Sequence, residues 1–280
     1  MTLLIIIFTI AFIQIWDKDI PVHKDGWFAR FIAKLAAHKN RFVQRHASVL
    51  AIVIILLLAH ILVSVLSDIS SWLLLPFGTL ILLYSIGRGE YLSILDTFTQ
   101  TCGSQDWQAS TQQALALDVK LDGIEANDWT ELYNRVLEAA SYRGFERTFA
   151  VLFWFFILGP VGALLYRLLF LVNVRQWHSN VLTAKLLWVV EWPAVRVLGL
   201  SFAVTGNFMG CLSRWQQRFL CPSSRTEFIL VEAVLGALSV GDEVQASCDV
   251  TRTELRLLRG LYVRTLWFWL AVMSLILLFF

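Results

Sequence analysis

The sequence has the composition of a membrane protein. Of its 280 residues, 58% are hydrophobic and only 16% are charged, and a mean hydropathy of +0.66 argues against an ordinary soluble domain. The net charge of +2 does not suggest a nucleic-acid partner. The cysteines are far apart and include no Cys-x-x-Cys pair, which argues against a zinc site and a disulfide scaffold and favours structural cysteines in a reduced, cytoplasmic setting. They are Cys102, Cys211, Cys221 and Cys248.

The first 46 residues combine a short apolar segment with a basic connection. Met1 to Trp16 has neither a basic start nor a small-residue cleavage site, so it is not a cleaved signal peptide and predicts a short span or a half-buried helix. Residues 17–46 carry seven Lys or Arg against three Asp, which predicts a cytoplasmic location. Apolar residues from Trp27 to Phe42 recur at helical spacing, so we expect an amphipathic helix lying on anionic headgroups.

Two predicted spans complete an N-terminal membrane region, residues 1–88. Ala47 to Leu66 is almost uninterrupted, and residues 67–71 form a polar turn without basic side chains that is predicted to lie outside. Trp72 to Ile86 returns inward. Arg88 then lies between two glycines at the cytoplasmic end, where it either binds a phosphate or carboxylate or anchors the helix end.

Residues 89–147 are predicted to form an acidic cytoplasmic helical region. Between positions 90 and 147 there are ten acidic residues and four basic ones. Asp128 and Glu131 have the spacing of a capping box at the start of a helix. We expect the last helix of this region to continue into the membrane, which places Glu138 about two turns before Glu146 on nearly the same face.

Thr148 to Val172 is predicted to be a single transmembrane helix. Arg167 is its only charged residue. At about 1.5 Å per residue this run exceeds the roughly 30 Å of a hydrocarbon core. Glu146 and Arg147 stand at its entrance, where they can pair or hold a ligand, or serve as a capping pair and an interfacial anchor.

The C-terminal membrane region, residues 148–280, contains a second charged apolar run. Residues 186–204 are interrupted by Glu191, Pro193 and Arg196, and charges inside such a run need partners or a cavity. We expect a helix bent at Pro193, and a structural Glu191 to Arg196 pair is the alternative. Capping patterns at Ser224 and Thr251 predict two further helices, and the final span starts at about Leu266.

Several of these residues resemble the signature region of the CobD/CbiB family of cobalamin-biosynthesis membrane proteins. The matching positions are Glu138, Glu146, Leu152-Phe153-Trp154, Gly162, Ala163, Tyr166 and Asn173, with Glu191 to Arg196 and Gly206-Asn207 further along. Tyr142, Arg143, Arg147 and Arg175 replace acidic, amide or glycine positions of that family. The overall pattern most resembles the divergent AmpE branch, which is linked to cell-wall amidase activity and β-lactamase induction.

The resemblance implies a function in the bacterial inner membrane. The expected protein is a multi-pass signalling or accessory protein that links cell-wall (muropeptide) status to β-lactamase induction and binds an anionic metabolite. The alternative is a membrane enzyme of CobD/CbiB type, which ligates an amide in a nucleotide-dependent reaction and uses a nucleotide or Mg²⁺ as cofactor. The expected partners are the lipid bilayer and an anionic wall metabolite or a muropeptide-pathway protein, without nucleic acid.

The sequence thus predicts an all-α, polytopic membrane protein with a cytoplasmic helical segment. Neither catalytic residues nor metal ligands are predicted. We expect the ligand-binding residues to line one polar cavity at the cytoplasmic membrane face. They are Arg88, Glu138, Glu146, Arg147, Asn173, Glu191 and Arg196.

Overall fold

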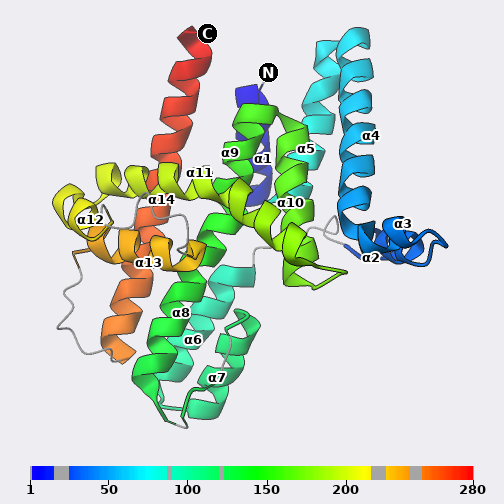
Figure 1. The fold of residues 1–280 in the computed structure, drawn as a ribbon. Helices are drawn as coiled ribbons and strands as arrows, with labels where there is room; N and C mark the ends of the chain where they lie inside the picture. The colour runs from blue at the N-terminus through cyan, green and yellow to red at the C-terminus, as the bar shows by residue number, and fades with distance from the viewer. Residues whose placement is uncertain are drawn as a thin grey trace. The chain divides into compact units, whose positions relative to one another are not determined.

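The computed structural model describes residues 2–15, 25–86, 90–119, 123–125, 127–215, 225–239 and 248–279, and every regular element in these ranges is a helix. This confirms the all-α class. Three helices are long and apolar enough to cross a membrane: α4 (Ala47–Ile69), α11 (Val181–Thr205) and α14 (Cys248–Phe279). Figure 1 shows the helices along the chain.

The helices group into two compact units. Unit 1 comprises Met1–Arg88 and Ala150–Trp192, and unit 2 comprises Gly89–Phe149 and Pro193–Phe280. Residues 148–280, predicted as one region, therefore contribute to both units. Helix α11 begins in unit 1 and ends in unit 2, and Pro193 lies inside it at the boundary.

Unit 1 contains a basic helical segment that packs against a candidate span. Its N-terminal helices are α1 (Thr2–Ile15), α2 (Gly26–Ala36), α3 (Arg41–Arg45), α4, the 3-10 turn η1 (Ser71–Leu73) and α5 (Leu74–Ser85). The apolar face of α2 includes Phe28 and Ile32, which are buried in one hydrophobic cluster with Ala51 of α4. The amphipathic pattern is therefore used for packing inside the unit. Helix α4 extends through Ile69, so the predicted turn at 67–71 begins only at Ser70.

The predicted single span from Thr148 to Val172 is wrong, because the chain reverses in its middle. Helix α9 (Ala150–Leu158) ends at Gly159, whose φ of 65° favours glycine, and Pro160 starts α10 (Pro160–Val174). The two helices contact each other and stand side by side in Figure 1. Each is shorter than the roughly 20 residues that a spanning helix needs. The element is a helical hairpin.

Unit 2 begins with the helical bundle that the sequence predicts. Its helices are α6 (Glu90–Gly103), α7 (Trp107–Ala116) and α8 (Trp129–Gly144). Helix α7 contacts both α6 and α8. The backbone N–H of Glu131 donates a hydrogen bond to the Asp128 carboxylate at 3.1 Å, which confirms the predicted cap at the start of α8.

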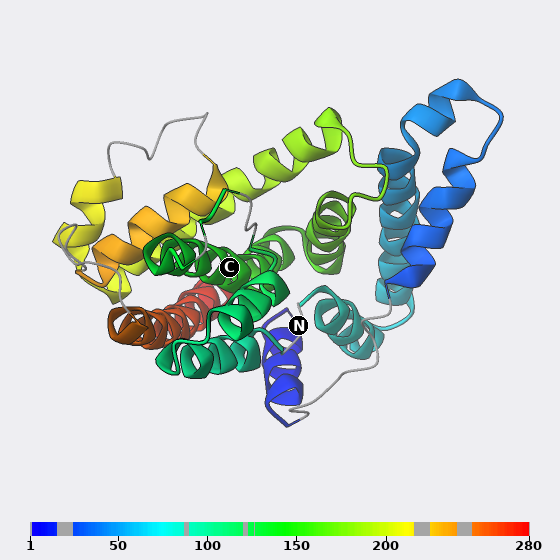
Figure 2. The same cartoon turned by 90° about the horizontal axis from the view of Figure 1, so that it is seen from below.

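The C-terminal half of unit 2 is held together by close helix contacts. After α11 come α12 (Phe208–Trp215), α13 (Thr226–Ala237) and α14. A Cβ added to Gly210 of α12 would lie 2.5 Å from the Gly236 carbonyl oxygen of α13, so the two backbones touch. Figure 2 shows this pair from below. Helix α14 begins at Cys248, so the predicted cap at Thr251 is wrong, and Ser224 lies outside the described residues.

The prediction that the cysteines form no disulfide is also wrong. Cys102 at the end of α6 forms a disulfide with Cys248 at the start of α14, with 5.8 Å between their Cα atoms. The two residues are 146 positions apart, and the folding of unit 2 brings α6 against α14. Sequence spacing carries no information about such a contact. Cys211 is a free, buried thiol, and Cys221 lies outside the described residues.

Candidate functional site

The seven predicted ligand-binding residues fall into separate parts of the structure. Arg88 lies outside the described residues. Asn173 and Glu191 belong to unit 1. The other four, Glu138, Glu146, Arg147 and Arg196, belong to unit 2. A single cavity lined by all seven therefore stays a prediction, and the polar groups of each unit are described separately.

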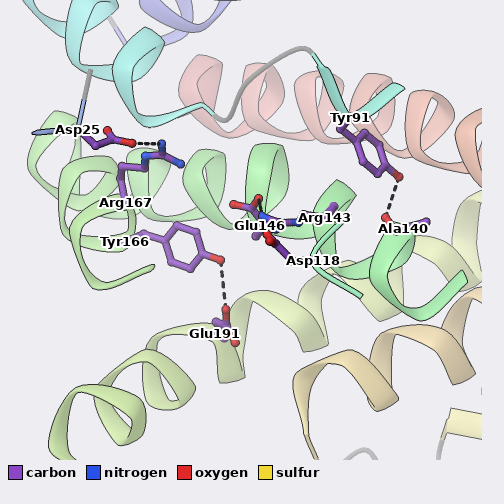
Figure 3. A network of polar contacts seen from close by, with 9 residues as sticks. All are labelled: Asp25, Tyr91, Asp118, Ala140, Arg143, Glu146, Tyr166, Arg167 and Glu191. Atoms are coloured by element: carbon purple, nitrogen blue, oxygen red, sulfur yellow. Dashed lines mark hydrogen bonds and ion pairs between the residues drawn. The ribbon is translucent and has the colours of Figure 1, made fainter. Parts of the chain in front are cut away.

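The main polar group of unit 2 is the Arg143 cluster, formed by Asp118, Arg143 and Glu146 (Figure 3). Arg143 lies near the end of α8 and forms ion pairs on two sides. Its Nη1 is 3.3 Å from Oε1 of Glu146, and its Nη2 pairs with Asp118. The Glu146 side chain is only 5% exposed, whereas that of Asp118 is 64% exposed. The guanidinium thus has a buried partner and a partner that water reaches.

A π-helical turn, η2 (Phe145–Phe149), positions Glu146. Each end of this turn is fixed by a buried phenylalanine, and the Phe149 ring contacts those of Tyr262 and Trp269 of α14 at 5.5 and 5.2 Å. A π-turn widens the helix and changes which residues face inward, and such turns frequently occur at functional sites. Glu146 is therefore held inside the protein where α8 leads toward the apolar hairpin.

Arg147 follows Glu146 in the chain, and its guanidinium covers an aromatic ring. Its guanidinium carbon is 5.8 Å from the centre of the Tyr91 ring, a cation–π distance. The Tyr91 hydroxyl donates a hydrogen bond to the Ala140 carbonyl at 2.7 Å. Burial raises the pKa of Tyr91, and the positive charge of Arg147 offsets only part of this rise. Tyr91 thus stays a neutral hydrogen-bond donor at physiological pH.

Glu138 faces a different set of charges from those paired with Arg143. Burial and the nearby carboxylate of Glu227 in α13 raise the pKa of Glu138, and the positive charges of Arg225 and Arg135 only partly offset them. When folding raises the pKa of a carboxyl group, the protein becomes less stable as the pH rises through that pKa. The reason is that the folded state must then give up a proton that it binds more tightly than the unfolded state does.

We therefore expect Glu138→Gln to stabilise the protein at neutral pH and to have almost no effect at acidic pH. The gain should be less than about 1 kcal/mol, because the side chain is partly exposed and solvent screens it. The melting temperature measured from about pH 4 to pH 8 tests this, since the range starts near the ordinary pKa of Glu. The exposed Glu125→Gln is the control and should not change the pH profile. Parallel profiles for wild type and Glu138→Gln would contradict the expectation.

Unit 1 contains a buried ion pair that the sequence did not reveal. Nη2 of Arg167 in α10 lies 3.4 Å from Oδ2 of Asp25 at the start of α2, and both side chains are buried or nearly so. The Tyr84 hydroxyl donates a hydrogen bond to the other Asp25 oxygen at 3.2 Å. The sequence identified Arg167 as an isolated charge, and nothing in it points to a partner 142 residues away. The pair links the start of α2 to α10 of the hairpin.

The two predicted site residues of unit 1 make structural contacts. The Asn173 amide donates hydrogen bonds to the carbonyls of Leu169 and Thr183 at 2.8 and 3.2 Å, so it joins α10 to α11. Glu191 is buried and accepts a hydrogen bond from the Tyr166 hydroxyl at 3.2 Å (Figure 3). Their positions follow from the packing of α11 against the hairpin, since the Trp154 indole N–H also donates to the Val190 carbonyl at 3.0 Å.

Comparisons with known proteins gave no match from which a function could be inferred. No protein-family model, curated protein or solved structure matches the chain. Within the described ranges, no group of three or more His, Cys, Asp or Glu side chains lies close enough together to hold a metal ion. Sequence reasoning missed Asp118, Arg143 and Tyr91 as site residues. Of these three, only Arg143 gave a signal, because Arg143 and Arg147 are basic at positions where the resembled family lacks basic groups.

Proposed function

We propose that this chain is a multi-pass protein of the bacterial inner membrane that acts as an accessory or signalling component and binds an anionic metabolite through Arg143 and Arg147. The observation that supports this most is the asymmetric pairing of Arg143. Glu146 holds the guanidinium from the buried side, while the exposed carboxylate of Asp118 covers its outer side.

Asp118 occupies the position that a ligand anion would take. A guanidinium presents its donors in a planar fork that matches a carboxylate or a phosphate. Asp118 follows α7, has a φ of 58° and is largely exposed, so water can replace its contact at low cost. Glu146 already neutralises part of the charge of Arg143. Arg147, whose guanidinium lies over the Tyr91 ring, adds a second positive charge four residues further along the chain.

The cell-wall connection rests on the resemblance to the AmpE branch. It suggests a carboxylated sugar of the wall as the first probe. N-acetylmuramic acid and N-acetylglucosamine form a matched pair, because the first carries a lactyl carboxylate and the second does not. The amide-ligase alternative likewise rests on the resemblance alone.

Binding of N-acetylmuramic acid to the purified protein, followed by calorimetry or ligand-observed NMR, tests the proposal. We expect binding of this acid but not of N-acetylglucosamine. Asp118→Asn should tighten binding several-fold because it removes the competing carboxylate. Arg147→Met should weaken binding about tenfold or more, as expected for a charge-assisted hydrogen bond worth about 1.5–3 kcal/mol.

Two further variants separate a specific effect from a change of overall charge. Asp96→Asn makes the same charge change at an exposed position of α6 and should leave affinity unchanged. Arg143→Lys keeps the buried charge opposite Glu146 but loses the planar fork, so it should weaken binding without unfolding the protein. The proposal fails if neither the wild type nor Asp118→Asn binds the acid, or if Asp96→Asn tightens binding as much as Asp118→Asn.

A further inference from the structure

In unit 2, the part of α11 after Pro193 lies across α14. Figure 1 shows α14 running lengthwise while α11 passes it crosswise. Side-chain hydrogen bonds join the two helices where they cross. The Trp269 indole N–H donates to the Ser201 hydroxyl at 2.8 Å, and the hydroxyls of Thr205 and Thr265 are 2.8 Å apart. The crossing therefore involves the segment of α14 around Thr265.

Helix α14 changes character at this crossing. Four arginines precede Thr265, and residues 265–279 contain no ionisable side chain. Helix α14 is one of the helices long and apolar enough to cross a membrane. Charged side chains collect at the ends of a span and avoid its centre, so the edge of the hydrocarbon core lies close to Thr265. The crossing helix is consequently at the level of the bilayer interface.

The crossing helix is apolar on its outer side as well as its inner side. Its outer stripe, defined by Val197, Leu200 and Val204, is between 41% and 60% exposed. The spacing of three and four residues places these side chains on one helical face. Leu198 and Phe202 on the other side are fully buried. Apolar side chains on a helix belong in a protein core or in lipid, and the exposure of the outer stripe shows that the described residues do not bury it.

We propose that residues 193–205 lie in the plane of the membrane interface, with the outer stripe among the lipid acyl chains. By length and composition α11 could cross the bilayer, but a helix that lies across a spanning helix at its interfacial end cannot also span. The lipid assignment follows from continuity, because Val263 and Trp267 of α14 expose apolar side chains at the same level. This part of α11 is an in-plane membrane segment.

Nitroxide depth measurements test the proposal. Single cysteines replace Val197, Leu200 and Val204 in a background carrying Cys211→Ala and Cys221→Ala, with the Cys102–Cys248 disulfide retained. The labelled full chain is reconstituted in vesicles of phosphatidylcholine and phosphatidylglycerol. Depth is measured from collisions with oxygen, which concentrates in the acyl chains, and with a water-soluble nickel chelate. Val263→Cys and Val272→Cys on α14 provide a ruler of about 13 Å at about 1.5 Å per residue.

The expected result is one depth for all three stripe positions, just inside the headgroups and close to that of Val263→Cys. A spanning helix would instead separate positions 197 and 204 by about 10 Å, and such a gradient overturns the proposal. Labels that meet the nickel chelate but little oxygen would place the stripe in water and also overturn it. Labels shielded from both reagents would mean that protein, such as a second copy, covers the stripe, which equally rejects a lipid contact.

Discussion

Gly162→Ala is expected to lower the free energy of unfolding by about 3 kcal/mol, at the upper end of the range for overpacking. A Cβ at this position would lie 2.2 Å from the Trp154 carbonyl oxygen and 2.7 Å from the Leu158 Cβ. Both atoms belong to α9, the other arm of the hairpin, and the nearer one is backbone. The added methyl group therefore cannot be accommodated by a side-chain rotation, and the two helices must separate.

The sign of this effect distinguishes the hairpin from a single span. In one straight helix Gly162 would be more than two turns from Trp154, and alanine would stabilise the helix by roughly 0.5–1 kcal/mol relative to glycine. In the hairpin the same substitution destabilises. Because Trp154 also bonds the Val190 carbonyl, separation of the helices should change the near-ultraviolet circular dichroism of tryptophan as well.

Gly260→Ala is the matched control. It makes the same chemical change inside α14, where nothing lies within 4 Å of the added Cβ. Thermal unfolding in detergent should show a melting temperature lowered by roughly 6–12 °C for Gly162→Ala, using about 2–4 °C per kcal/mol, and unchanged or raised for Gly260→Ala. If both variants are equally stable, α9 and α10 do not pack as a hairpin.

The parts of the fold that the sequence predicts correctly are set by neighbouring residues. Asp128 caps α8 because the N–H that it binds is three residues away, and the apolar run of α4 is visible in any window. The same local reasoning misjudged Gly159 and Pro160. A glycine followed by proline is compatible with a kinked span as well as with a reversal, and only the packing of α10 against α9 selects the reversal.

The parts of the candidate sites that the sequence does not predict depend on contacts between distant residues. Arg167 was recognised as the one charge in an apolar run, but its partner Asp25 lies 142 residues earlier, directly before α2. Asp118, two residues after the end of α7, reaches Arg143 because α7 contacts α8. Neither pairing leaves a periodicity or a motif in the sequence. Charged residues in apolar runs therefore indicate that partners exist, while the fold decides which residues they are.

Cys102→Ser is expected to lower the free energy of unfolding of the oxidised protein by about 2–5 kcal/mol, the usual cost of losing a native disulfide. The bond closes a loop of 146 positions and links α6 to α14 at the polar end of unit 2. A disulfide that closes a long loop removes more conformational entropy from the unfolded chain. We therefore expect a loss of stability toward the upper part of that range.

A reductant provides the internal control for this expectation. Dithiothreitol should destabilise the wild type as much as Cys102→Ser does, and should have no further effect on that variant. Cys211→Ala removes a free, buried thiol, so its smaller cost should be the same with and without reductant. Equal stability of wild type and Cys102→Ser under oxidising conditions would show that the bond does not constrain the fold.

The same bond predicts on which side of the membrane this end of unit 2 lies. Disulfides persist in oxidising compartments and are rare in the cytosol, so the bond indicates the extracytoplasmic side, opposite to the side that the charge pattern predicts for residues 89–147. Alkylation of growing cells with a maleimide of high mass should therefore leave Cys102 and Cys248 unmodified until the protein is denatured and reduced. If denaturation alone allows both residues to react, the thiols are reduced in the cell, and the cytoplasmic placement of residues 89–147 holds.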